Sequence, residues 1–322
     1  MTVDETREDL IRRLKMLSER LWEGRCKRPD IDAWLNNFDG RHCGGDSEKE
    51  RLHALHLLAH VSYFGLPEIR VLLRAMYRDL FRYPIVQKLR RDLGGTTDTE
   101  EIGRRFSEEL QSTRFVGMGN PAESGTHLLY YFRQENRLPK SLFVHQHELL
   151  TSAANDPDAD FSPPNLKRIV FIDDFCGSGE QSVRYSRKVL RVLDDVAKKR
   201  GSEVTYSYFV LFGTEDGLAH ARSESEFDVV DAVSTLDSTD QTFGADSRIF
   251  RRPPGAIAAA TSKYLAFHYG RELFPRWPLG FEDNQLLLAF HHNIPDNSLP
   301  ILWFDEGEPT WAAIFPRHPK ID

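Results

Sequence analysis

The chain has 322 residues, of which 40% are hydrophobic and 28% are charged, and its formal net charge at pH 7 is −7. This composition is typical of a globular protein with a sizeable core, and the negative charge argues against a general binder of nucleic acids or membrane surfaces. No stretch reaches the roughly 20 apolar residues that a membrane-spanning helix needs. The three cysteines, Cys26, Cys43 and Cys176, show no disulfide spacing. We therefore expect a cytoplasmic protein from a reducing compartment, without a membrane segment.

Residues 1–110 are expected to form a helical N-terminal region, and residues 111–322 an α/β domain. Leu66-Pro67-Glu68 starts the clearest helix, whose apolar residues recur at 3.6-residue spacing up to Phe81. Its opposite face carries four arginines, each four residues from the next: Arg70, Arg74, Arg78 and Arg82. Such a stripe suits phosphates or an acidic partner, and a solvated face is the alternative interpretation.

Just before this helix, His53, His56 and His60 share one helical face. Three imidazoles at this spacing could bind a metal ion, but no cysteine or carboxylate completes the set. Histidines that are satisfied inside a helical core are the favoured interpretation.

From about residue 112 onward, strand and helix signals alternate, which indicates a parallel α/β sheet. The expected strands are 113–116, 142–147, 169–172, 204–212 and 228–233, and the expected helices are 126–135 and 183–199. The polar, proline-bearing segment 151–165 is expected to be a mobile loop.

Residues 167–182 carry the most informative pattern in the chain. Four apolar residues are followed by Asp173 and Asp174 and then by a glycine-rich turn that leads directly into a helix. This pattern predicts a buried parallel strand whose carboxyl end presents two carboxylates and the N–H groups of the next helix. Such N–H groups bind phosphates, and the carboxylates suit ribose hydroxyls or Mg²⁺. An ordinary strand, turn and capped helix is the structural alternative.

Two protein families resemble this stretch. The type I phosphoribosyltransferases have four apolar residues, two acids, two further apolar residues and a Thr/Ser-Gly turn, which residues 170–179 resemble; Gln181 stands where that family usually has Thr or Ser. The S-adenosylmethionine motif of amino-methyltransferases is similar over residues 175–179. The methyltransferase alternative is weaker, because its catalytic tetrapeptide would have to be residues 162–165, which lack the final aromatic and lie too close to the cofactor motif.

The first resemblance implies a type I phosphoribosyltransferase-like fold, an α/β parallel sheet flanked by helices. It implies a pentosyl or phosphoribosyl transferase whose donor is phosphoribosyl pyrophosphate (PRPP) or another ribose-phosphate, bound with Mg²⁺. Asp173 and Asp174 would be the catalytic residues and would hold the sugar hydroxyls or the metal ion. The 5′-phosphate would lie on the turn and the helix start, formed by Gly177, Ser178, Gly179, Glu180, Gln181 and Ser182. A diphosphate loop would contribute Gly119, Glu123, Ser124 and Gly125, and the segment 151–165 would close over the site as a lid.

Further stretches resemble the phosphoribosyltransferase-like proteins of bacterial conflict systems, the PRTase-CE type, which include effectors that accompany retrons. These stretches are 31–38, 63–70, 119–127, 281–287 and 292–303. The resemblance implies a toxic effector in defence against phage that acts on a host nucleotide, base or nucleic acid. Its implied partners are a reverse transcriptase and its RNA–DNA product, for which the arginine stripe is a candidate contact. A non-catalytic nucleotide-binding scaffold or regulator is the alternative, and the sequence leaves the oligomeric state open.

The C-terminal segment is the expected acceptor pocket. Asn284, Asn293 and Asn297 offer neutral hydrogen-bonding groups, and Trp303 offers a ring on which a base could stack. An Asn/Pro-rich turn that is stabilised by its own side chains is the alternative.

Overall fold

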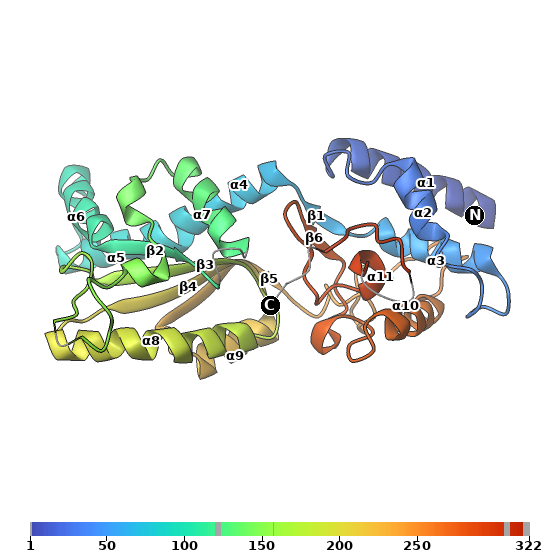
Figure 1. Cartoon of the computed structure of the whole chain (residues 1–322). Coiled ribbons are helices and arrows are strands. Elements are labelled where there is room, and N and C mark those ends of the chain that lie inside the picture. The colour runs from blue at the N-terminus through green and yellow to red at the C-terminus, as the bar shows by residue number, and fades with distance from the viewer. Residues whose placement is uncertain (1, 120–123, 157, 306–309, 318–322) are drawn as a thin grey trace. The chain divides into compact units, whose positions relative to one another are not determined.

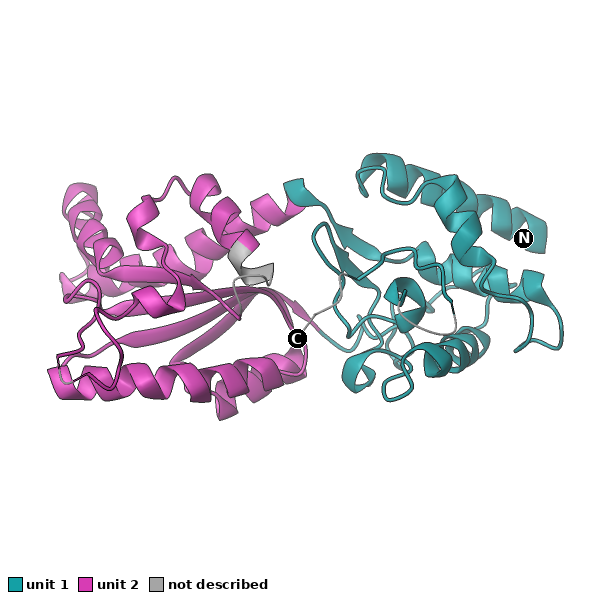
Figure 2. Ribbon diagram, in the orientation of Figure 1, with its two compact units in different colours: residues 1–67, 237–322 teal, residues 68–236 magenta. Residues whose placement is uncertain are grey.

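The computed structural model of the chain describes residues 2–119, 124–156, 158–305 and 310–317. The chain divides into two compact units, which are described separately: unit 1 comprises residues 1–67 and 237–322, and unit 2 comprises residues 68–236 (Figure 2). This division differs from the boundary expected between residues 110 and 111. The helices that follow residue 67 belong with the sheet of unit 2, and the C-terminal segment belongs with the first helices in unit 1.

The sheet of unit 2 has four parallel strands in the order β2-β3-β4-β5 (Figure 1). They are β2 (Thr113–Gly117), β3 (Arg168–Cys176), β4 (Thr205–Thr214) and β5 (Val229–Leu236), and they confirm four of the predicted strands. In the interior of the sheet, Ile172 of β3 lies opposite Gly117 of β2 and Phe209 of β4. Both faces of β3 are covered, which explains why its sequence is a continuous apolar run and does not alternate.

Helices cover both faces of this sheet. On one face lie α8 (Glu180–Arg200) and α9 (Glu215–Glu224) (Figure 1). The other side carries α4 (Leu66–Ala75), the π-helix η1 (Met76–Arg82), α5 (Tyr83–Asp92), α6 (Thr99–Gln111) and α7 (Ser124–Glu135). The predicted fold class is therefore confirmed: a parallel α/β sheet flanked by helices, preceded by a helical N-terminal region. Because β3 leads into α8 and β4 leads into α9, two helix N-termini lie at the carboxyl ends of neighbouring strands.

The prediction of a strand at residues 142–147 is wrong for most of that segment. The structure has a single parallel bridge there, between Phe143 and Phe115 of β2, set between the 3₁₀ helices η2 (Lys140–Leu142) and η3 (Gln146–Glu148). The carboxylate of Glu148 accepts the backbone N–H of His145 at 2.6 Å. This local hydrogen bond favours a turn over an extended chain and ends the pairing after one residue.

The segment 151–165 does not cover the acidic motif, so its prediction as a lid over that motif is wrong. Leu150 and Phe161 form an antiparallel bridge, and Phe161 is fully buried in the core. The guanidinium of Arg200 donates to the carbonyl oxygen of Ala159 at 2.8 Å. Arg200 is the last residue of α8, whereas the acidic motif precedes the first residue of the same helix. The apolar anchors in a mostly polar stretch hold the segment at the far end of α8.

Unit 1 is mainly helical. Its elements are α1 (Val3–Arg20), α2 (Arg28–Leu35), α3 (Ser47–Leu58), α10 (Ala259–Leu273), the 3₁₀ helix η4 (Phe281–Asp283) and α11 (Pro300–Trp303), with a two-stranded parallel sheet of β1 (Ser62–Phe64) and β6 (Leu288–Phe290). Phe38 packs edge-on against Trp34, Tyr269 and Trp311, with ring centroids 5.1 to 5.5 Å apart. Residues from both ends of the chain therefore share one aromatic core. In the part of the chain that the structure describes, no helix has the length and apolar character needed to cross a membrane.

Candidate functional site

A glycine turn joins the acidic end of β3 to the first residue of α8. Gly179 immediately precedes α8 and has a φ of 78°, in the left-handed region that favours glycine. A Cβ at this position would lie 2.5 Å from the carbonyl oxygen of Gly217 in α9. Both the backbone conformation and the close approach of α9 therefore require glycine at residue 179.

The start of α9 fixes the same turn from the side. The hydroxyl of Thr214 donates to the carbonyl oxygen of Gly177 and accepts the N–H of Gly217, the latter at 2.9 Å. A Cβ on Gly217 would overlap the carbonyl oxygen of Gly177. In addition, Glu180 of α8 pairs with His220 of α9 at 3.1 Å. The turn is thus held in one conformation by its neighbour and is organised before any ligand binds.

The first turn of α8 presents backbone N–H groups at the carboxyl end of the sheet. Ser178 Oγ accepts the N–H of Glu180 at 3.3 Å, and the buried hydroxyl of Ser182 donates to the carbonyl oxygen of Gly179 at 2.7 Å. Gln181 is exposed. The N–H groups and dipole of a 21-residue helix favour an anion at this end, while the carboxylate of Glu180 already contributes negative charge there.

Asp173 is buried and uses both of its carboxylate oxygens within the protein. One oxygen accepts the backbone N–H of Asp174 at 3.0 Å, and the other accepts the hydroxyl of Tyr208 at 3.4 Å. Burial, followed by the charge of Asp173, holds the pKa of Tyr208 well above its usual value. The same two causes raise the pKa of the Cys176 thiol to about 12. Cys176 is therefore a protonated, structural thiol at neutral pH and not a nucleophile.

Asp174, the next residue of β3, is buried like Asp173. Neighbouring strand residues point to opposite faces, so Asp174 points away from Tyr208. Within the described ranges, no group of three or more His, Cys, Asp or Glu side chains could hold a metal ion. Mg²⁺ commonly binds through one or two carboxylates while substrate phosphates and water complete its shell. The adjacent carboxylates Asp173 and Asp174 are of the number and chemistry that such an ion uses, and a magnesium ion here stays a prediction.

The end of β2 lies beside the acidic end of β3. The N–H of Met118 donates to the carbonyl oxygen of Ile172 at 2.9 Å, which places Gly119 close to the acidic pair. Of the other residues predicted for a diphosphate loop, Glu123 lies outside the described residues, and Ser124 and Gly125 begin α7.

A hollow of about 310 Å³ opens at this edge, between the end of β2 and the turn that follows Phe143. It is lined by Val116, Gly117, Gly119, Leu129, Val144, His145, Gln146 and His147. The exposed rings of His145 and His147 stack with their centroids 5.7 Å apart. Both histidines belong to the segment predicted as a strand. That prediction gave no indication that they line a hollow beside β2.

The four residues predicted for an acceptor pocket belong to unit 1, whereas the acidic motif belongs to unit 2. Asn297 is buried, and its amide donates to the carbonyl oxygen of Phe281 at 3.4 Å. The indole N–H of Trp303 donates to the carbonyl oxygen of Ser298 at 2.8 Å. The carbonyl oxygen of Asn293 accepts the N–H of Phe290, and the amide of Asn284 donates to the carbonyl oxygen of Glu282. These contacts agree with the alternative interpretation of this segment, an Asn/Pro-rich turn that is stabilised by its own side chains. Its role as an acceptor pocket stays a prediction.

The four arginines predicted to form one stripe contact partners within unit 2, and two of them share one carboxylate. Arg70 and Arg74 approach the carboxylate of Glu135 at 3.4 and 3.8 Å, and Arg78 pairs with Asp79 at 2.6 Å. Arg82 lies over the ring of Phe106. The π-helix η1 widens the turn from Met76 onward, so the 3.6-residue spacing assumed for the stripe does not continue through it. A contact between these arginines and a nucleic acid stays a prediction.

The chain is similar to several solved structures and matches one family model. Among solved structures, the chain is similar to orotate phosphoribosyltransferase from Aeropyrum pernix, with 18% identity over 50% of this chain and 75% of that chain and a TM-score of 0.23. It is also similar to the xanthine-guanine-hypoxanthine phosphoribosyltransferase of Helicobacter pylori (13% identity, 55% and 92% covered, TM-score 0.25). A third is adenine phosphoribosyl transferase from Trypanosoma brucei (16% identity, 54% and 80% covered, TM-score 0.21). A search of curated proteins gives no match. The PRTase-CE family model matches residues 31–317, nearly the whole length, and the chain therefore belongs to the PRTase-CE family.

Proposed function

We propose that unit 2 binds a PRPP-like ribose-phosphate donor with Mg²⁺ at the carboxyl ends of β2 and β3 and transfers its pentosyl group to a nucleotide, base or nucleic acid. The observation that carries this proposal is the preorganised turn at Gly177–Gly179. It sets the N-terminus of a long helix beside a parallel strand that ends in two carboxylates. Membership of the PRTase-CE family supports a phosphoribosyltransferase-type function at the general level.

The residues divide the work of binding the donor. We assign the 5′-phosphate to the N–H groups at the start of α8, where the N–H of Glu180 already donates to Ser178 Oγ. Asp174 takes the ribose hydroxyls or the magnesium ion, and Asp173 positions the strand end through Tyr208 and the backbone. Bound Mg²⁺ would neutralise the charge of the diphosphate leaving group. Residues 117–125 contain no lysine or arginine, so backbone N–H groups must supply the rest of the diphosphate binding.

The biological role that we propose is that of an effector in anti-phage defence of the retron type, silent until its partners release it. The support is the resemblance of five separate stretches to such effectors together with the family match over residues 31–317. Recovery of the chain from its host with reverse transcriptase and RNA–DNA product would agree with this role. Recovery of the chain alone, without protein or nucleic acid, would contradict it.

A non-catalytic nucleotide-binding regulator on the same fold is the second candidate. It is favoured by the use of both Asp173 oxygens within the protein, which commits that carboxylate to structure. The two candidates differ in one outcome. If expression of the chain is toxic, Asp174→Asn abolishes the toxicity of an enzyme, whereas the toxicity of a binding protein survives a change that leaves the fold intact.

Calorimetric titration of the chain with PRPP and Mg²⁺ tests the donor site. Gln181 is exposed in the first turn of α8, where a glutamate stabilises the helix dipole but repels a phosphate. We expect Gln181→Glu to weaken binding about tenfold or more while its melting temperature stays unchanged or rises. Gln181→Ala, the neutral control at the same position, keeps the affinity. Equal binding by the wild type and Gln181→Glu, or no binding by the wild type, would contradict the assignment.

A further inference from the structure

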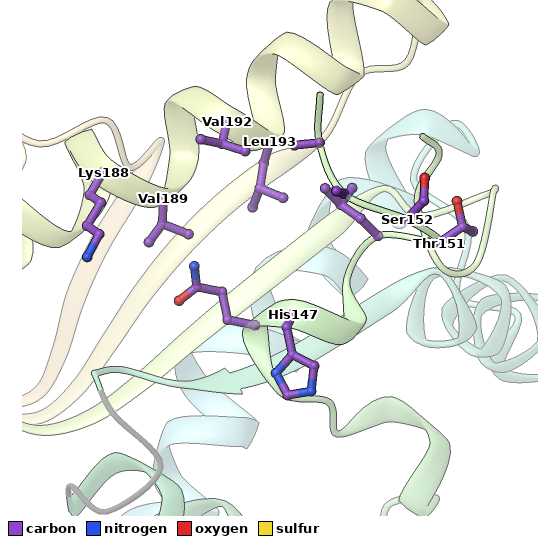
Figure 3. Close-up of a pocket in the computed structure, with 11 residues that line it drawn as sticks. His147, Thr151, Ser152, Lys188, Val189, Val192 and Leu193 are labelled. Carbon is purple, nitrogen blue, oxygen red and sulfur yellow. The ribbon is translucent and has the colours of Figure 1, made fainter. Parts of the chain in front are cut away.

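A second pocket in unit 2, of about 350 Å³, lies along the middle of α8 and apart from the glycine turn (Figure 3). Val189, Val192 and Leu193 of α8 form one wall. Leu150 and Ala153, which follow η3, belong to the opposite wall. None of these five residues belongs to the donor site proposed above, and their apolar side chains suit the apolar body of a small ligand.

The charged side chain that lines this pocket is positive. Lys188 lines it from α8, and the described residues that line it include no aspartate or glutamate. An apolar cavity with an ammonium group at its rim attracts an anionic group and gives a cation no partner.

Two further observations indicate a ligand in this pocket. Ser152 Oγ is buried and has no hydrogen-bond partner in the described part of the chain, although buried hydroxyls nearly always have one. Val192 is 43% exposed despite its apolar side chain. A ligand with an apolar body and a polar end would cover the valine and satisfy the hydroxyl. Figure 3 shows Lys188 and Ser152 on opposite sides of the apolar walls.

We propose that this pocket is a binding site for a small planar carboxylate, an aromatic ring system with an anionic group at one end and a hydrogen-bonding group at the other. The carboxylate pairs with Lys188, the ring lies against Val192, and the far polar group meets Ser152. The site shares Gln146 and His147 with the hollow beside β2 but includes no residue of the acidic motif or the glycine turn, and its occupation does not depend on phosphoribosyl transfer.

Titration of the full chain with 6-hydroxy-2-naphthoate, followed by calorimetry, tests this site. We expect saturable binding at one site and an affinity about tenfold lower for 2-naphthol, which lacks the carboxylate. Lys188→Glu lowers the affinity for the naphthoate about tenfold, because it replaces an attraction by a repulsion. Lys199→Glu, an equal change of charge on the same helix outside the pocket, leaves the affinity unchanged.

A second variant keeps the test independent of Lys188. Ala153 is exposed at the pocket, and Ala153→Trp fills the cavity without removing the lysine, so it is expected to abolish binding. Absence of saturable binding to the wild type would overturn the site. Equal affinities for the naphthoate and 2-naphthol, or for the wild type and Lys188→Glu, would overturn its selectivity for anions, and unchanged binding by Ala153→Trp would overturn its location.

Discussion

Two buried carboxylates, Glu50 of unit 1 and Asp173 of unit 2, are satisfied by the same kinds of group. Glu50 accepts the backbone N–H groups of Gly40 and His42, both at 2.8 Å, and the hydroxyl of Tyr269 at 2.6 Å. Asp173 likewise accepts one backbone N–H and one tyrosine hydroxyl. Each carboxylate therefore fixes the loop or strand end that surrounds it.

The two regions differ in the structure that follows the backbone fixed by each carboxylate. The loop at Gly40 folds back on itself, since a Cβ on Gly40 would lie 2.7 Å from the backbone of Gly45. The turn after Asp173 instead carries a second carboxylate and leads into the N-terminus of α8. A buried acid alone thus indicates structure. An acid next to a helix N-terminus, at the carboxyl end of parallel strands, indicates a ligand site.

Removal of Glu50 is the change expected to have the largest effect on stability. Glu50 is fully buried, and Glu50→Ala leaves the N–H groups of Gly40 and His42 without an acceptor. We expect the free energy of unfolding of unit 1 to fall by about 3 kcal/mol or more. Urea denaturation followed by tryptophan fluorescence measures this unit alone, because its residues include all five tryptophans: Trp22, Trp34, Trp277, Trp303 and Trp311.

Glu48→Ala, on the same helix, is the matched control. The side chain of Glu48 is 53% exposed and pairs with Arg51, so its loss is expected to cost less than about 1 kcal/mol. Similar midpoints for Glu50→Ala and Glu48→Ala would show that Glu50 does not hold the loop.

The next largest effect on stability is expected in unit 2, from a substitution next to the glycine turn. Gly217→Ala places a methyl group against the carbonyl oxygen of Gly177 and displaces the turn. We expect it to lower the stability of unit 2 by about 2 kcal/mol and to abolish binding of PRPP. In α6, Gly103→Ala is the same substitution in open space and is expected to raise stability by about 0.5 kcal/mol or more. Hydrogen exchange of β3 and calorimetry measure the two effects; retained binding by Gly217→Ala would contradict this account of the turn.

Local patterns in the sequence were sufficient to predict β2 to β5, the glycine turn and the start of α8. A run of apolar residues, two acids and clustered glycines are signals within a few residues of one another. The role of Glu50 had no such signal, because its partner Tyr269 lies 219 residues away in the sequence. The lid was misplaced for a related reason: the contact of Arg200 with Ala159 spans 41 residues and depends on the packing of Phe161.

As the pH falls, unit 1 is expected to lose stability at a higher pH than unit 2. The buried histidines of the described chain, His53 and His56, both belong to unit 1. Burial, followed by the nearby ring of His60, lowers the pKa of His56 from 6.5 to about 3. Between these values the unfolded chain binds a proton that the folded unit does not, so stability is lost as the pH falls below 6.5.

This linkage predicts a loss of about 2 kcal/mol at pH 5 from His56 alone. His56→Leu removes the titrating group, and its tryptophan-monitored unfolding is expected to depend less on pH between 5 and 7. Burial also lowers the pKa values of His53 and His60, so part of the pH dependence remains in the variant. A wild type with constant stability over this range would contradict the prediction.

The smallest effect tests the acidic pair itself, in which one carboxylate is assigned to structure and the other to the ligand. Asp173→Asn keeps the shape of the side chain but weakens its bonds to the N–H of Asp174 and the hydroxyl of Tyr208, so unit 2 is expected to lose about 1 kcal/mol of stability. Because Asp174 points away from Tyr208, Asp174→Asn is expected to abolish the Mg²⁺-dependent part of PRPP binding, while Asp173→Asn retains it. Titrations with and without Mg²⁺, on variants with measured melting profiles, separate the two roles. Equal losses of binding would show that both carboxylates face the ligand, and Asp173 would then differ from Glu50 in its function as well as in its surroundings.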